Sequence, residues 1–167
     1  EHMPSIGYKQ LKPLVESARL SGAAAAEVLA SSWAGNQVVS AGTRIGPVTR
    51  TSGQSLAIRV WMEDGRSGSA SGSLSQGGAL VDKAVAKAES ATPSEFSGPV
   101  QRMRVAPGGL STADQRWEQI GDDDRIDVVN SNERSVSSGH PSIHSTRFTY
   151  EDRETFRAFV NTRGVEL

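Results

Sequence analysis

The sequence predicts an α+β fold in which a mixed, mainly antiparallel sheet carries helices packed on one side. Apolar residues recur at helical spacing in residues 8–18 and 80–88. Strict alternation of side chains over residues 56–62, followed by Asp64-Gly65, indicates a strand that turns back as a hairpin. Only 36% of the residues are hydrophobic and 17 are glycine, so we expect a single modest core.

The first predicted element is a helix that ends near Gly22. Pro13 either kinks this helix or occupies its first turn, where the missing N–H costs nothing. Glu1-His2-Met3 reads as a cloning scar, so the domain is expected to comprise residues 4–167. The apolar positions of the helix are Tyr8, Leu11, Leu14, Val15 and Ala18.

Two short strands should follow, at residues 27–33 and 37–39, separated by a turn at Gly35-Asn36. Residues 41–53 are rich in Gly, Thr and Ser, and Pro47 cannot donate to a central ladder. We therefore expect an edge strand or a loop there.

The predicted hairpin at residues 56–72 has one arm of large side chains and a return arm of Ser, Gly and Ala, joined by a two-residue turn. Such a return strand lets another backbone approach closely. We favour packing of the Ala-rich helix at 76–91 against it, small on small. The alternative is that an extended peptide or a partner subunit adds to the strand. The residues that would make this contact are Arg59, Trp61, Arg66, Ser67, Ser69 and Ser71.

From Ser73 onward, the sequence predicts three helices and then two further strands. Ser73-x-x-Gln76 has the form of a capping box for the helix that runs to about Ala91. A long connection spans residues 92–110. The remaining predicted elements are a short helix capped at Ser111-x-x-Asp114, a helix from Asp122 to about Arg134 broken at Ser137-Ser138-Gly139, strands at 144–150 and 155–160, and a turn at 161–164.

Composition argues against several classes of partner. The chain has 18 Lys and Arg residues against 19 Asp and Glu, so its net charge of −1 gives no reason to expect nucleic acid. No apolar run is long enough to span a bilayer, so no membrane is expected. The absence of cysteine removes disulfides and thiolate metal sites, and it fits a cytoplasmic location.

We expect no catalytic residue and no metal ligand in this chain. His140 and His144 have the spacing of a zinc helix, but Pro141 opposes helix there and no glutamate lies between them. A hydrolase that uses Ser69 or Ser71 with one of these histidines stays as a minor alternative, because residues 68–72 lack the strand-to-helix turn of a nucleophile elbow.

The order of elements and four motifs carry a resemblance to a known family. The motifs are Gly22-Ala23 with Ala26-Glu27-Val28, Leu56 to Trp61, Gly65 to Ser71, and Asn161-Thr162-Arg163-Gly164-Val165. In this order they resemble the N-terminal domain of the TldD/PmbA family, two-subunit zinc metalloproteases once described as modulators of DNA gyrase. The Gly-Ser-Ala-Ser form of the return strand is more similar to the PmbA (TldE) branch.

The resemblance implies a non-catalytic N-terminal domain that contributes to dimer assembly and to the access of unfolded peptides. Its partners would be a TldD/PmbA-type subunit or a second copy, and unfolded peptide. The family's zinc site lies in the C-terminal domain of the catalytic subunit, so no cofactor is expected here. Leu167 falls where family members continue, which suggests a truncation. The alternative is a stand-alone protein-binding or regulatory module with no protease parent.

Overall fold

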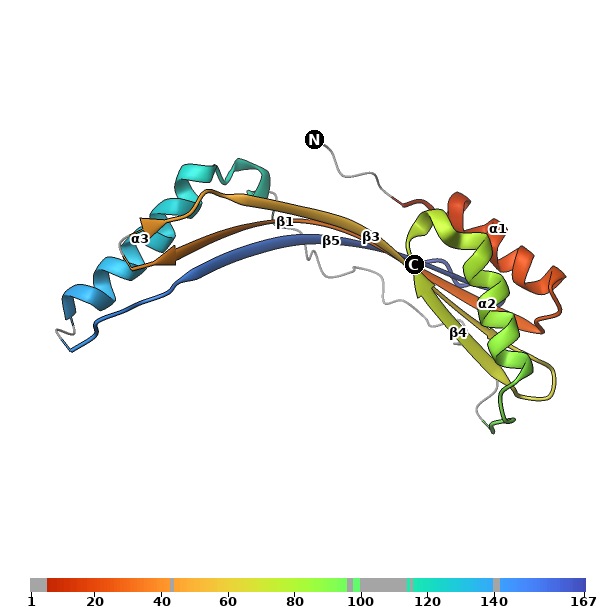
Figure 1. Cartoon of the computed structure of the whole chain (residues 1–167). Coiled ribbons are helices and arrows are strands. Elements are labelled where there is room, and N and C mark those ends of the chain that lie inside the picture. The colour runs from red at the N-terminus through yellow and green to blue at the C-terminus, as the bar shows by residue number, and fades with distance from the viewer. Residues whose placement is uncertain (1–5, 43, 96–97, 100–113, 115, 140–141) are drawn as a thin grey trace. The chain divides into compact units, whose positions relative to one another are not determined.

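The computed structural model describes residues 6–42, 44–95, 98–99, 114, 116–139 and 142–167 (Figure 1). Strand β1 pairs with β2, β3 and β5, and β3 pairs with β4. Strands β1 and β2, and strands β3 and β4, pair in antiparallel register, which confirms the predicted fold class. The elements are α1 (Tyr8–Leu20), β1 (Ala25–Ala41), β2 (Arg44–Ile45), β3 (Thr49–Trp61), β4 (Ser67–Gly72), α2 (Gly77–Glu89), α3 (Asp122–Gly139) and β5 (Thr149–Asn161), with short 3₁₀ turns at Leu74–Gln76 and Trp117–Gln119.

The chain folds as two compact units. Unit 1 comprises Glu1–Trp33, Gly53–Pro107 and Thr155–Leu167, and unit 2 comprises Ala34–Ser52 and Gly108–Glu154. Strands β1, β3 and β5 each contribute residues to both units. The predicted connection at 92–110 and the predicted cap at 111–114 lie mostly outside the described residues.

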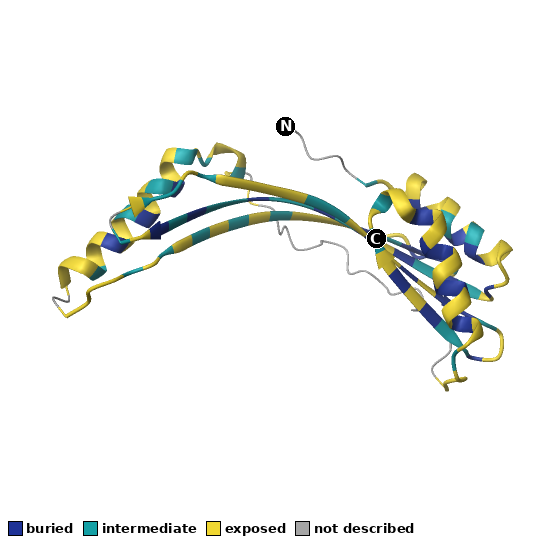
Figure 2. Ribbon diagram, in the orientation of Figure 1, coloured by how far each residue is buried: buried dark blue, intermediate teal, exposed yellow. Residues whose placement is uncertain are grey.

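The hydrophobic core of unit 1 lies between one face of its strands and the helices α1 and α2, whose inner faces are buried (Figure 2). Of the apolar positions predicted for helix α1, Leu11, Val15 and Ala18 are buried, Leu14 is half-buried and Tyr8 is exposed. Pro13 sits inside the helix and not in its first turn. The strands contribute Ala26, Val28, Leu56, Ile58, Val60, Ala70, Ala158 and Val160, and α2 contributes Leu80, Val81, Ala84, Val85 and Ala88.

Helix α2 packs directly on the small residues of β4. A Cβ atom placed on Gly68 would lie 2.1 Å from the carbonyl oxygen of Ala84 and 2.4 Å from the backbone nitrogen of Ala88. Only glycine fits at this crossing, because both of these atoms belong to the helix backbone. The favoured interpretation of the return strand, small residues packed against the Ala-rich helix, is confirmed.

The turn of the β3–β4 hairpin is one residue longer than predicted. The Met62 and Arg66 backbones pair, with Met62 N–H donating to Arg66 O at 2.8 Å, and Gly65 N–H donates to Met62 O at 3.1 Å. The loop therefore consists of Glu63, Asp64 and Gly65, a turn closed by a glycine at φ 87°. This is the three-residue hairpin with a glycine bulge, which the Asp-Gly pair alone does not distinguish from the two-residue form.

The predicted turn at Gly35-Asn36 is wrong, because β1 runs through both residues without a break. A Cβ atom on Gly35 would lie 2.5 Å from the backbone oxygen of Asp152 on β5. Asn36 donates to the Asp152 carboxylate from its backbone nitrogen at 3.2 Å and from its side-chain nitrogen at 2.8 Å. The Gly-Asn pair therefore marks a close approach of two strands. Glycine within a strand often occurs where another backbone approaches closely.

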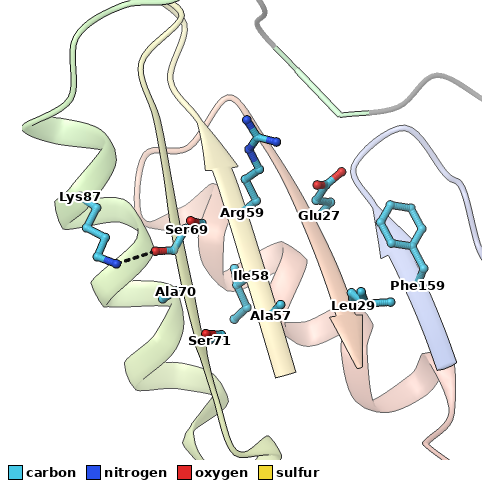
Figure 3. A pocket seen from close by; sticks show the side chains of 10 residues that line it. All are labelled: Glu27, Leu29, Ala57, Ile58, Arg59, Ser69, Ala70, Ser71, Lys87 and Phe159. Atoms are coloured by element: carbon cyan, nitrogen blue, oxygen red, sulfur yellow. Dashed lines mark hydrogen bonds between the residues drawn. The ribbon is translucent and has the colours of Figure 1, made fainter. Parts of the chain in front are cut away.

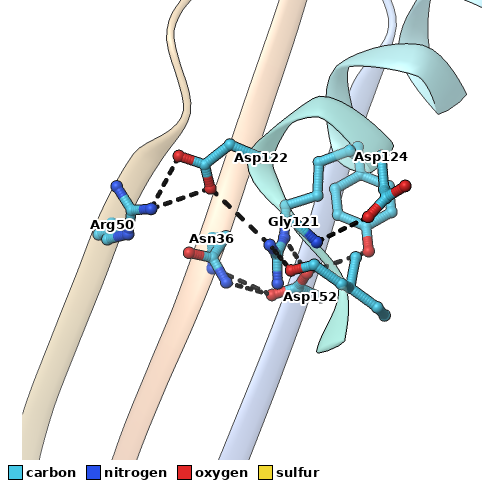
Figure 4. A network of polar contacts seen from close by, with 9 residues as sticks. Asn36, Arg50, Gly121, Asp122, Asp124 and Asp152 are labelled. Atoms are coloured by element: carbon cyan, nitrogen blue, oxygen red, sulfur yellow. Dashed lines mark hydrogen bonds and ion pairs between the residues drawn. The ribbon is translucent and has the colours of Figure 1, made fainter. Parts of the chain in front are cut away.

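In unit 2, a polar network attaches the start of α3 to the sheet (Figure 4). Arg125 is 5% exposed, and its guanidinium donates to Asp152 Oδ2 at 2.7 Å and to the carbonyl oxygen of Ile120. Tyr150 O–H donates to the same carboxylate oxygen at 3.0 Å. At the rim, Arg50 pairs with Asp122 at 2.8 Å. The network thus satisfies a buried cation with a carboxylate and a carbonyl.

The end of α3 and the strand after it also differ from the prediction. The helix continues to Gly139, since Ser137 and Ser138 donate to the carbonyl oxygens of Glu133 and Arg134, both at 2.6 Å. These bonds keep the two serines within the last turn of the helix. The two predicted strands at 144–150 and 155–160 are one strand, β5. The predicted turn at 161–164 is present, with Asn161 Oδ1 accepting from Arg163 and Val165 backbone nitrogens.

The contribution of Asp152 to stability should disappear as the pH falls below about 4. Burial raises the pKa of this carboxyl, but hydrogen bonds from Asn36, Arg125 and Tyr150 together lower it further, so its pKa lies below the usual value. A carboxyl with a depressed folded pKa contributes stability that is present above its unfolded pKa and is lost as the pH falls through the folded pKa. The difference in Tm between the wild type and Asp152→Asn should therefore be largest at pH 7 and shrink in acid. A difference that is constant with pH would contradict the assignment.

Candidate functional site

The face of the unit 1 sheet opposite α1 and α2 carries a groove of about 460 Å³ (Figure 3). Along β3 and β4 the exposed positions alternate with the buried ones, so Ala57, Ser69 and Ser71 point to this open face. Because these side chains are small, they form a low floor. The longer side chains that line the groove are Glu27, Leu29, Arg59, Lys87 and Phe159.

Strand β4 offers a free backbone edge beside the groove. Since Met62 and Arg66 form a hydrogen-bonded pair, alternation along the ladder turns the backbone groups of Gly68, Ala70 and Gly72 towards β3. Those of Ser67, Ser69 and Ser71 then point outward, and no strand of the described residues pairs with that edge.

Lys87 occupies part of this edge. It extends from α2, and its Nζ donates to the carbonyl oxygen of Ser69 at 2.9 Å, as Figure 3 shows. A lysine on an edge strand opposes uncontrolled pairing with other chains. The ammonium group can nevertheless rotate away, because its stem is flexible and exposed.

Opposite charges lie next to each other across β1 and β3. Burial raises the pKa of Glu27, and the positive charge of Arg59 opposes this rise without cancelling it. The Arg59 guanidinium also lies over the ring of Trp61, 4.9 Å from its centroid. The groove therefore presents one carboxyl group and two cations, Arg59 and Lys87, around a floor of small side chains.

The structure brings together three of the six predicted contact residues. Arg59, Ser69 and Ser71 line the groove. Trp61 is only 3% exposed, and Ser67 is half-buried at the edge of β4. Arg66 is engaged elsewhere, since it pairs with Asp64 at 2.7 Å and donates to the carbonyl oxygen of Glu89.

Sequence reasoning missed seven of the ten lining residues of the groove: Glu27, Leu29, Ala57, Ile58, Ala70, Lys87 and Phe159. Glu27 and Leu29 alternate with the buried Ala26, Val28 and Ala30, a period-two signal that could have identified the open face. No comparable signal singles out Lys87, because it is one of several charged residues on the outer side of a helix.

Nothing in the described residues assembles hydrolytic or metal chemistry. Ser69 and Ser71 belong to unit 1 and His144 to unit 2, and no hydrogen bond among the described residues joins a histidine to either serine. His140 lies outside the described residues. Within the described part of the chain, no three His, Asp or Glu side chains are grouped as a metal site would require. None of its helices combines the length and apolar character needed to cross a membrane.

No protein-family model and no curated protein matches the sequence. Solved structures do match its fold. A candidate modulator of DNA gyrase from Bacteroides thetaiotaomicron has a TM-score of 0.80 at 18% identity, covering 95% of this chain and 37% of that one. Its counterpart from Thermotoga maritima has a TM-score of 0.71 at 15% identity, with coverage of 95% and 36%.

TldE from Thermococcus kodakarensis gives a TM-score of 0.67 at 14% identity, covering 95% of this chain and 36% of that one. The TM-scores of these three structures establish a shared fold, and at sequence identities this low they establish the fold alone. The chain spans little more than a third of the length of each of these proteins.

Proposed function

We propose that this chain is the N-terminal, non-catalytic domain of a TldD/PmbA-type zinc metalloprotease subunit. The observation that carries the proposal is the shared fold over 95% of the chain with TldE and with two candidate gyrase modulators. The four motifs noted in the sequence add to it, and their Gly-Ser-Ala-Ser version favours the PmbA branch. Zinc would be held by the C-terminal domain of the catalytic subunit, and the complex would be cytoplasmic.

Within that role, the domain would contribute to subunit pairing and would admit unfolded peptides along β4. The outward backbone groups of Ser67, Ser69 and Ser71 can hydrogen-bond an extended segment, which is recognition by strand addition. The small floor at Ala57 leaves room for an apolar side chain of that segment, beside Leu29 and Phe159.

Filling the groove should weaken peptide capture while leaving the fold intact. Ala57→Trp places a large ring on an exposed position of the floor, so it should weaken binding of a labelled, permanently unfolded protein such as carboxymethylated α-lactalbumin by about tenfold or more. Fluorescence anisotropy measures this binding. Ala79→Trp is the matched control, since Ala79 is exposed on α2 and does not line the groove.

A second variant tests strand addition itself. Ser69→Pro removes an outward N–H without breaking a bond to β3, so it should also weaken capture. If neither variant changes binding, the groove and the edge are not the peptide site. A zinc-dependent cleavage by the purified chain that a chelator stops would overturn its non-catalytic role.

The competing function is a stand-alone protein-binding module, which the same free edge would serve. Affinity capture with a full-length TldD-type subunit separates the two. Formation of a complex with that subunit supports the metalloprotease role. Failure to bind that subunit, together with retained capture of unfolded protein, supports the separate module.

A further inference from the structure

A second groove, in unit 2, has a buried carboxylate that lacks a cationic partner. Helix α3 buries three side chains on one face, Arg125, Val129 and Glu133, each four residues from the next. Arg125 has its ion pair with Asp152. Glu133 is 7% exposed, and it forms no ion pair with any described residue.

The partners of Glu133 leave one oxygen unused. Thr146 Oγ1 donates to Glu133 Oε1 at 3.2 Å, and no other hydrogen bond to the carboxylate is found among the described residues. The second oxygen is not sealed in the interior, because the described side-chain atoms that are both fully buried and unbonded are only those of Ser32 and Trp117. A buried carboxylate is costly without a compensating partner.

Glu133 lines a groove of about 370 Å³ between α3 and residues 142–146. One wall is apolar, because Ile143 is 40% exposed there. Asn130 and Ser145 line the groove and carry further hydrogen-bond acceptors. The full lining is Gly42, Asn130, Glu133, Arg134, Ser137, Ile143, His144, Ser145 and Thr146.

We propose that this groove receives an arginine side chain from a protein partner, with its guanidinium against Glu133 and its aliphatic stem along Ile143. The guanidinium is the cation best suited to the site, since its planar fork reaches several acceptors at once and it is weakly hydrated. The stem can lie on apolar surface while the charged head is paired. The proposal is independent of the peptide groove in unit 1.

Arg134 also lines the groove, and its positive charge opposes a guest cation. Arg134 is exposed, and it forms no ion pair with another described residue. Its charge at the rim should weaken the binding of arginine without preventing it, because exposed charges are screened by solvent. Removing the charge of Arg134 should therefore tighten the binding of arginine.

The probe is N-acetyl-arginine amide, compared with its neutral isostere N-acetyl-citrulline amide, titrated into the 167-residue chain. Saturable shifts of the amide resonances of residues 130–137 and 143–146 are expected, with a Kd on the order of a millimolar. Citrulline should bind about tenfold more weakly, because it keeps the shape but loses the charge. N-acetyl-lysine amide should fall between the two.

Three variants locate the site. Glu133→Gln keeps an acceptor for Thr146 and should abolish the arginine response, while Glu151→Gln, at an exposed ion pair with Arg153, should leave it unchanged. Arg134→Gln should tighten binding about twofold or more.

Equal binding of arginine and citrulline, or an unchanged response in Glu133→Gln, would overturn the proposal. So would the absence of saturable shifts at about 50 mM probe, well above the expected Kd. The comparison of arginine with citrulline uses the unaltered chain, so it decides the matter even if Glu133→Gln does not fold.

Discussion

Gly68→Val is expected to lower the free energy of unfolding by at least about 3 kcal/mol. The first added carbon would already lie 2.1 Å from Ala84 O and 2.4 Å from Ala88 N, and both contacts are with backbone atoms of α2. A flexible side chain could move aside, but a helix backbone moves only as a whole. Because α2 supplies Leu80, Val81 and Val85 to the core of unit 1, its displacement exposes much of that core.

Urea denaturation followed by circular dichroism measures this loss, and Gly78→Ala is the matched control. Gly78 lies in the first turn of α2, where a Cβ atom would meet nothing within 4 Å. Replacement by alanine should therefore raise stability by about 0.5–1 kcal/mol through helix propensity. Equal effects of the two substitutions would show that β4 and α2 are not packed as closely as described.

Asp152→Ala is expected to lower the free energy of unfolding by about 3–5 kcal/mol, which is the cost of removing one partner of a buried ion pair. The carboxylate accepts from the backbone and side-chain nitrogens of Asn36, from Arg125 and from Tyr150, so its loss leaves four donor groups without their acceptor. The largest part of the cost comes from Arg125, because its guanidinium is 5% exposed and would remain charged in the interior.

Hydrogen exchange of the α3 amides, together with urea denaturation, measures this effect where it arises. Protection of α3 should fall, since Arg125 attaches the first turns of the helix to β5. Glu151→Ala is the control on the same strand. Glu151 pairs with Arg153 at the surface, so its loss should cost less than about 1 kcal/mol. A similarly small effect of Asp152→Ala would show that Arg125 is satisfied without this carboxylate.

Local sequence patterns correctly predicted the helices and strands whose signal lies in residues of the element itself. The spacing of Leu11, Val15 and Ala18 is a property of one helix, and it identified the face that the structure buries. The same holds for the alternation along β3 and for the capping box, in which Ser73 N–H donates to Gln76 Oε1 at 3.2 Å.

Prediction failed where a local signal has two uses. Gly35-Asn36 has the composition of a turn, but here the glycine admits the backbone of β5 and the asparagine bonds to Asp152. The split predicted within β5 has a related cause, because its charged residues weaken the alternation that marks a strand. Pairing with β1 maintains the strand regardless.

The candidate site in unit 1 was predicted in part for the same reason. Arg59, Ser69 and Ser71 belong to adjacent strands of one hairpin, so their common face follows from the register that the turn sets. Glu27 and Phe159 come from β1 and β5, and Lys87 comes from a helix on the other side of β4. Only the assembled sheet places them beside the hairpin.

The sequence by itself determined the α+β class, the amphipathic helices, the hairpin and the small-residue strand, because periodicity and turn chemistry act between residues close in the chain. The tertiary structure alone decided which glycines lie in turns and which lie where two backbones approach closely. It also decided that Arg125 and Glu133 are buried on the same face of α3. It further decided that, of these two side chains, Arg125 has a partner of opposite charge among the described residues and Glu133 has none. These outcomes depend on contacts between distant segments, and a single sequence carries no local signal for them.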